Sequence, residues 1–178
     1  LQYLKRPYGE LAWLINTHAA NQPERIALDD GEEQLTWAET AAFVNRIAAQ
    51  LQAEGLQKGQ AVSILGTTTI RYALVYLGAI VAGGCAAPLT TSATPYQLAA
   101  MMTDSGAGHL FIDNLKRAEL ADGGVALPAL KHVMMDAPDE SDGAPLLFEW
   151  MADEGATPLD VETGPNDPYN IIYSSGTT

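Results

Sequence analysis

The stretch AVSILGTTTIRYALVYLGAIVAGGCAAPL, residues 61–89, decides the fold class. Residues 61–65 are short, nearly wholly apolar and followed by a Thr-rich loop, which is typical of a strand buried on both faces. Residues 70–81 are predicted to form a helix, which Gly83-Gly84 ends, and residues 85–89 read as a second buried strand. The order strand, helix, strand predicts two parallel strands joined by a crossover helix.

The same alternation continues toward the carboxyl end. Thr94-Pro95-Tyr96-Gln97 is a capping box with Pro at the first helical position, so a helix is predicted from there to about Asp104, with Gly106 as its cap. His109–Asp113 is the next predicted strand. The alternation of elements from residue 60 to 113 therefore predicts an α/β fold with a layered sheet of mostly parallel strands, flanked by helices.

The amino-terminal part adds helices and a hairpin. A capping box at Thr36-Trp37-Ala38-Glu39 predicts a helix that ends at Gly55. Its apolar face comprises Ala41, Val44, Ile47, Ala48 and Leu51. The elements predicted outside this helix and the alternating region are a helix at 8–20, strands at 25–29, 34–36 and 131–135, a short helix at 146–154 and a surface connection at 161–168.

Length, charge and cysteine content limit the classes of function that the chain can have. The 178 residues fit one domain, and a net charge of −13 argues against nucleic acid as a partner because phosphate backbones are repelled. Cys85 is the single cysteine, which suits a reducing cytoplasm. The uncharged run 72–103 is long enough to span a bilayer, but Gly83-Gly84, Pro88 and Pro95 interrupt it, so no membrane span is predicted.

The chemistry is concentrated in the last ten residues, 169–178, which read YNIIYSSGTT. A short apolar strand runs directly into a loop of small and hydroxyl-bearing residues. Such a loop lets backbone N–H groups approach phosphate oxygens, and its hydroxyls add donors. The predicted nucleotide-binding residues are Ser174, Ser175, Gly176, Thr177 and Thr178. The loop is no Walker A motif, because Gly-Lys-Ser/Thr does not follow, and composition alone is also compatible with a simple polar tail.

The run Tyr173–Thr178 resembles the start of the phosphate loop of the adenylate-forming (AMP-binding) superfamily, of the acyl-CoA synthetase or fatty-acid–CoA ligase type. Further segments resemble motifs of that family, in the family's order: 35–39, 55–65, 77–84 with Pro88-Leu89, and 104–107. The resemblance covers about residues 9–178. It departs from the family at Gln60, where an acidic residue is frequent, and at Thr90-Thr91, where Asn or Asp is frequent. Residues 85–90 also lack the Tyr-Val-Pro-Leu-Asp pattern of the peptide-synthetase branch.

The resemblance implies that residues 1–178 are an incomplete N-terminal AMP-binding domain with an acyl-CoA synthetase-like fold, truncated within the phosphate loop. The parent protein would be an ATP-dependent acid–thiol ligase (AMP-forming) that joins a fatty, other acyl or aryl carboxylic acid to coenzyme A through an acyl-adenylate, aided by Mg²⁺. Residues 174–178 would hold the β- and γ-phosphates of ATP. The resemblance assigns no catalytic residue and no metal ligand within the chain, so the isolated chain is expected to be inactive; a homo-oligomer is compatible with it.

Two alternatives stay open: an adenylation domain that loads a carrier protein, and a non-catalytic α/β module that binds a nucleotide or a partner protein. The remaining polar and aromatic residues are interpreted as structural. The three histidines lack metal-ligand spacing, Cys85 reads as a buried inert thiol, and the acidic residues at 29–33 read as a solvated turn. The side chains interpreted as packing residues are Trp13, Trp37 and Trp150.

Overall fold

A computed structural model describes residues 10–128, 130–136 and 143–174 of the chain. Its centre is a parallel sheet with the strand order β4-β3-β5-β6. The strands are β3 (Ala61–Leu65), β4 (Cys85–Pro88), β5 (His109–Ile112) and β6 (Lys131–Met134). The sequence prediction of a layered α/β fold with parallel strands is confirmed.

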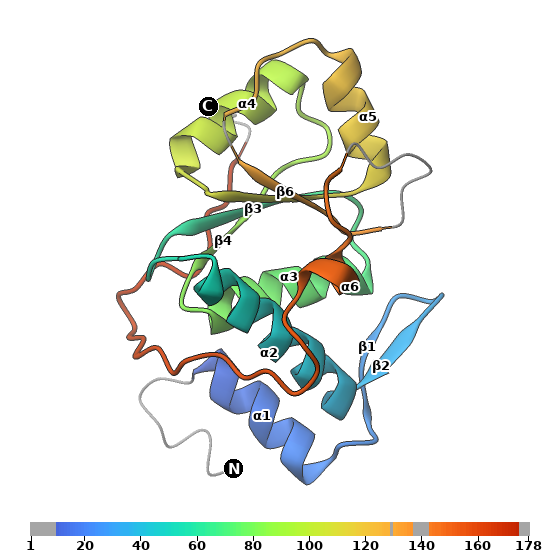
Figure 1. Ribbon diagram of the computed structural model, residues 1–178, viewed down its shortest axis with the longest axis vertical. Coiled ribbons are helices and arrows are strands. Elements are labelled where there is room, and N and C mark those ends of the chain that lie inside the picture. Colours follow the sequence, from blue (N-terminus) through green and yellow to red (C-terminus); the bar gives the residue numbers. More distant parts are fainter. Residues whose placement is uncertain (1–9, 129, 137–142, 175–178) are drawn as a thin grey trace.

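Helices cover both faces of this sheet (Figure 1). One face carries α4 (Pro95–Ser105) and α5 (Asn114–Asp122), and the other carries α2 (Trp37–Ala53) and α3 (Ile70–Val81), with α1 (Leu11–Asn21) packed beyond them. A separate antiparallel hairpin consists of β1 (Ile26–Asp29) and β2 (Gln34–Thr36). The short α6 (Leu147–Trp150) lies on the α2 side of the sheet.

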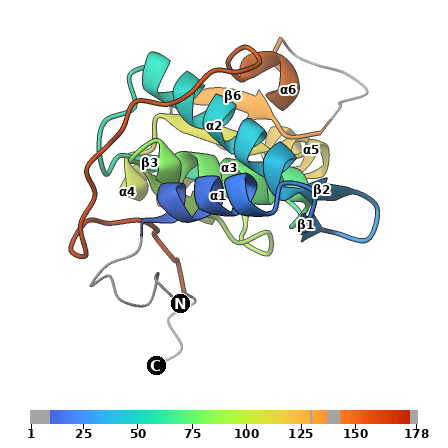
Figure 2. The same ribbon diagram turned by 90° about the horizontal axis from the view of Figure 1, so that it is seen from below.

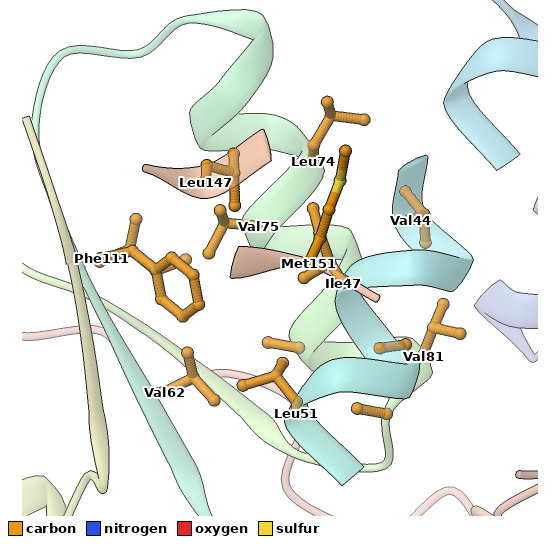
Figure 3. Close-up of a cluster of buried hydrophobic side chains, with 14 of the residues drawn as sticks. Val44, Ile47, Leu51, Val62, Leu74, Val75, Val81, Phe111, Leu147 and Met151 are labelled. Atoms are coloured by element: carbon orange, nitrogen blue, oxygen red, sulfur yellow. The ribbon is translucent and has the colours of Figure 1, made fainter. Parts of the chain in front are cut away.

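The larger apolar core lies between the sheet and the α2/α3 layer (Figure 3). Val44, Ile47 and Leu51 on α2 point toward the same interior as Leu74 and Val75 on α3. Residues from β3, β5 and the α6 region close it, and the figure labels Val62, Phe111, Leu147 and Met151 among them. The apolar face predicted for α2 is therefore its buried face, because all five predicted residues are buried.

Both predicted capping boxes are present. Thr36 Oγ1 accepts from the N–H of Glu39 at 3.3 Å, while the Thr36 N–H donates to Glu39 Oε2 at 2.8 Å. Thr94 and Gln97 make the same reciprocal pair at the start of α4, with Pro95 at the first helical position. Gly106 ends α4 in the left-handed conformation, with φ of 64°. The helix starts could be predicted because each depends on residues three positions apart.

The structure differs from the sequence prediction in two helices. Helix α5 was not predicted, although the backbone N–H of Lys116 donates to Asp113 Oδ1 at 2.8 Å, as at a capped helix start. Helix α6 spans four residues, shorter than the predicted 146–154. The backbone after Trp150 becomes extended at Met151, because Arg46 Nε binds the Ala152 carbonyl at 2.7 Å and holds the chain against α2.

After α6 the chain runs back across the molecule without helix or strand (Figure 2). Gln52 of α2 holds this connection, since its Nε2 donates to the Leu159 carbonyl and its Oε1 accepts from the Leu159 N–H. Lys58 and Asp167 form an ion pair at 2.8 Å near the end of the connection. In the described part of the chain, none of the helices combines the length and the apolar character that crossing a bilayer requires.

Candidate phosphate-binding site

The terminal segment 169–174 lies beside β4 and extends the sheet. The Ala86 N–H donates to the Tyr169 carbonyl at 2.9 Å, and the Ile171 N–H donates to the Ala86 carbonyl at 2.8 Å. The bridge between Ala86 and Asn170 is parallel. The segment therefore leaves the sheet at the edge where β3, β4 and β5 also end, which is the edge where ligands bind in open α/β sheets.

Alternating side chains of this segment face the α4 layer. Ile171 packs against a small cluster that contains Ala61, Ala87 and Ala107. Tyr173 packs against the apolar cluster under α4, and its hydroxyl lies 2.9 Å from the Met101 carbonyl and 3.0 Å from Asp104 Oδ2. Ile172, between them, is 76% exposed. This alternation is that of an extended chain, which forms one parallel bridge to β4 at Asn170.

Ser174 is exposed at the end of this strand. The other predicted phosphate-binding residues, Ser175, Gly176, Thr177 and Thr178, lie outside the described residues. The structure thus places the strand that leads into the predicted loop and the first of its five residues. An exposed hydroxyl at the carboxyl end of a parallel strand fits the chemistry of phosphate binding.

Neighbouring strands end in a hydrogen-bonded network at the same edge. Asp113, directly after β5, is buried, and its Oδ2 accepts from the N–H of Thr67 at 2.7 Å and from its hydroxyl at 3.2 Å. Asp136, after β6, accepts from the Asn114 N–H at 2.9 Å. A cavity of about 410 Å³ lies here, and both aspartates, Thr67 and Arg71 belong to its lining. Because these aspartates accept hydrogen bonds from backbone N–H groups of neighbouring loops, their role in this structure is to hold adjacent loops together.

A second, larger cavity of about 460 Å³ lies at the other end of the terminal segment. Its lining includes Tyr76 and Ile80 of α3, Tyr169, and Val161 of the connection after α6. It therefore opens near the amino end of the terminal strand, whereas Ser174 stands at the carboxyl end.

A charged group that the sequence did not predict lies at the amino ends of the central strands, opposite their carboxyl ends. Glu54, at the end of α2, accepts from His109 Nε2 at 2.7 Å, Trp150 Nε1 at 2.9 Å and Lys131 Nζ at 3.1 Å. Burial raises the pKa of Glu54, but hydrogen bonds from His109, Gln50, Lys131 and Trp150 outweigh it and bring the pKa to about 2. This cluster joins α2, α6 and the amino ends of β5 and β6.

The residues interpreted as structural have structural surroundings. Cys85 is fully buried, and burial raises the pKa of its thiol, as expected for an inert cysteine. His18 stacks on Trp37 with ring centroids 4.6 Å apart, and His109 is tied to Glu54. Burial, and then the charge of Arg117, lower the pKa of His132. Among the described residues no group of three His, Cys, Asp or Glu side chains could hold a metal ion.

The predicted acidic turn is only partly a solvated one. Asp29 and Asp30 accept hydrogen bonds from the backbone of their own turn. Asp30 Oδ2 also accepts from the Ile70 N–H at 3.0 Å, which ties the hairpin to the start of α3. That bond and the turn N–H groups lower the pKa of Asp30. Trp150 is the clearest of the predicted packing residues, with its ring 5.1 Å from that of Phe111 in a T-shaped contact.

Comparison with known proteins identifies the family. The family model described as "AMP-binding enzyme" matches residues 15–178. Indoleacetate–CoA ligase of Aromatoleum aromaticum is 28% identical over 95% of this chain and 33% of its own length. Surfactin synthase subunit 3 of Bacillus subtilis is 30% identical over 93% of this chain and 12% of its own length. The chain spans about half or less of the length of the first curated relatives that it matches.

Solved structures show the same fold. The anthranilate CoA ligase AuaEII in complex with anthranoyl-AMP superposes with a TM-score of 0.86 at 19% identity, over 100% of this chain and 35% of that one.

Proposed function

Because this chain belongs to the AMP-binding enzyme family, we propose that it is part of an ATP-dependent ligase that joins a carboxylic acid to coenzyme A through an acyl-adenylate. The observation that carries the proposal is the terminal strand, which lies parallel to β4 and delivers Ser174 to the carboxyl edge of the sheet. The residues that follow Ser174 in the sequence are small and mostly hydroxyl-bearing, which suits the phosphates of ATP.

In the proposed reaction the substrate carboxylate attacks the α-phosphate of ATP, so an acyl-adenylate forms and pyrophosphate leaves. The thiol of coenzyme A then takes the acyl group and AMP leaves. The barrier in the first step comes from bringing two anions together, so positioning and charge stabilisation are the main contributions expected from the protein. Residues 174–178 are proposed to hold the β- and γ-phosphates, while Mg²⁺ neutralises part of their charge.

The test is carboxylate-dependent exchange between ATP and pyrophosphate. It should be run on the complete gene product that contains this chain, with a panel of fatty, aromatic and alicyclic acids. Exchange that requires one class of acid supports adenylate formation and identifies the substrate class. A folded product that binds ATP but exchanges with none of the acids would contradict a ligase of these acid classes.

A carrier-protein-loading adenylation domain is the second candidate, favoured by the 30% identity to a surfactin synthase subunit. It shares the first half-reaction and differs only in the acceptor thiol. The two are separated by offering the adenylate-forming protein either coenzyme A or a carrier protein with a phosphopantetheine arm. Transfer to coenzyme A supports the first proposal, and transfer to the carrier alone supports the second.

The 178-residue chain by itself is predicted to form no AMP from ATP and any acid. The chain spans about half or less of the length of the first curated relatives that it matches, and catalysis requires groups that bind the acid, the nucleotide base and the phosphates together. Purified chain should therefore release no carboxylate-dependent AMP above a blank without protein. The complete gene product, assayed beside it with the same acids, is the positive control. Turnover by the isolated chain would refute this prediction.

A further inference from the structure

The strand before the phosphate loop is held at both of its ends. At the amino end, the backbone of Tyr169 and Ile171 is hydrogen-bonded to Ala86 of β4. At the carboxyl end, the hydroxyl of Tyr173 reaches the last turns of α4, at 2.9 Å from the Met101 carbonyl and 3.0 Å from Asp104 Oδ2. The second contact lies one residue before Ser174, so it bears directly on where the loop begins.

In this contact the Tyr173 hydroxyl is the donor, and its neighbours on α4 are the acceptors. A tyrosine hydroxyl has one proton to donate, and the Met101 carbonyl and Asp104 Oδ2 are both acceptors. A hydrogen bond to a carboxylate is shorter and stronger than one to a neutral group. Burial raises the pKa of Tyr173, and the neighbouring Asp104 raises it further, so the hydroxyl keeps its proton at neutral pH. The ring is also packed against the apolar cluster under α4, which limits the positions open to the hydroxyl.

The pair joins two distant motifs of the chain. Asp104 opens the run Asp104-Ser105-Gly106-Ala107, and Tyr173 opens the phosphate loop. They are 69 residues apart in sequence. Gly106 caps α4 two residues after Asp104, so the carboxylate stands in the last turn of the helix. Neither motif alone predicts a contact between them.

We propose that Tyr173 and Asp104 are a positioning pair that sets where the phosphate loop leaves the sheet, and so how well it receives the phosphates of ATP. This inference rests on the proposed function. Neither side chain is assigned a contact with ATP; both act through the backbone at Ser174. Because catalysis is sensitive to misplacement of about 1 Å, loosening this anchor should weaken productive ATP binding more than acid binding.

The experiment compares Tyr173→Phe, Asp104→Asn and the double variant in the complete gene product. ATP–pyrophosphate exchange gives KM for ATP and for the acid, and calorimetry gives the Kd of ATP directly. Tyr173→Phe is expected to raise KM and Kd for ATP about 3- to 10-fold, the effect of losing one hydrogen bond, with KM for the acid unchanged. Asp104→Asn should raise them less, because its amide oxygen and the Met101 carbonyl can still accept from the hydroxyl. The double variant should be no worse than Tyr173→Phe, because Tyr173→Phe already removes the hydroxyl that donates to Asp104. Tyr96→Phe, on the same helix with its side chain exposed, is the matched control and should change nothing.

Other outcomes overturn the pair. If the variants lower the urea midpoint and kcat while KM and Kd for ATP stay at the wild-type values, the contact only stabilises the fold. Additive effects in the double variant would show that the two residues do not act through each other. If the wild-type protein binds ATP but exchanges with no acid, the proposed function fails. The Kd values of the variants for ATP then still show whether Tyr173 and Asp104 affect ATP binding. A wild-type protein that binds no ATP would refute both.

Discussion

Glu54 is a carboxylate held by partners from three separate elements. Its side chain is 19% exposed and meets His109, Lys131 and Trp150 at hydrogen-bond distance. Two of these donors, His109 and Trp150, are buried, and leaving a buried donor without its acceptor is costly. Glu54 therefore fixes the end of α2 against the amino ends of β5 and β6.

Replacing Glu54 by Gln should lower the free energy of unfolding by about 1–3 kcal/mol at pH 7. The pKa of Glu54 is about 2 in the folded protein, below its ordinary value of 4.5. A lowered folded-state pKa contributes stability above about pH 4.5, and this contribution is lost as the pH falls toward 2. Urea denaturation at pH 7, 5, 4 and 3 should therefore show the gap between wild type and variant closing with acid.

Glu24→Gln is the matched control, because Glu24 is exposed. It should leave the urea midpoint within about 0.5 kcal/mol of wild type. A gap for Glu54→Gln that stays constant from pH 7 to pH 3 would contradict the assigned pKa.

At the residue scale, the sequence offers a candidate site only where the residues are consecutive. Residues 174–178 are consecutive, so their small and hydroxyl side chains form a pattern in the sequence. The partners of Glu54 stand 55, 77 and 96 residues away, and the Tyr173–Asp104 contact also spans two segments. A single sequence carries no signal for which distant side chains meet, so these contacts required the fold.

At the scale of elements, local signals explain both the successes and the miss. Helices α2 and α4 begin at capping boxes, whose partners are three residues apart. Helix α5 has little apolar character, and Leu120 is its buried apolar residue among those with described side chains. Periodicity therefore missed α5. Its available signal was Asp113 as the cap, followed by the good helix formers of residues 115–120.

Helices α2 and α3 approach closely at Gly78. A Cβ added there would lie 2.5 Å from Ile47 Cγ2 and 2.9 Å from Ile47 Cβ. Gly78→Ala should therefore overpack this interface and lower the free energy of unfolding by about 1–3 kcal/mol, despite the better helix propensity of Ala. Chemical denaturation measures the loss.

A double variant tests the cause of that loss. Ile47→Ala removes the methyl group that the new Cβ meets and costs about 2–5 kcal/mol by itself. Gly78→Ala combined with Ile47→Ala should cost less than the sum of the two, because each relieves the other. Simple additivity would mean that the helices separate freely and that Gly78 is not required by close packing.

At the scale of the whole molecule, the last described residues of the chain return to the parallel sheet and pair with β4. The terminal strand lies beside β4, and Ile171 contacts the cluster of Ala61, Ala87 and Ala107. The connection after α6 brings it there, held by Gln52 and by the Lys58–Asp167 ion pair. The terminal segment is therefore seated on strands from the middle third of the chain, and the connection that leads to it is held by residues of the first third.

This arrangement predicts opposite results for two adjacent isoleucines. Ile171 faces the alanine cluster and is partly buried, whereas Ile172 is 76% exposed. Ile171→Ala should lower the free energy of unfolding by about 1–2 kcal/mol, less than the 2–5 expected at a fully buried site. Ile172→Ala, identical in chemistry, should stay within about 0.5 kcal/mol of wild type. Urea denaturation measures the loss in the free energy of unfolding for both variants. Equal losses would mean that the terminal segment does not pack on the sheet. A larger loss for Ile172→Ala would mean that the register of the segment is shifted by one residue.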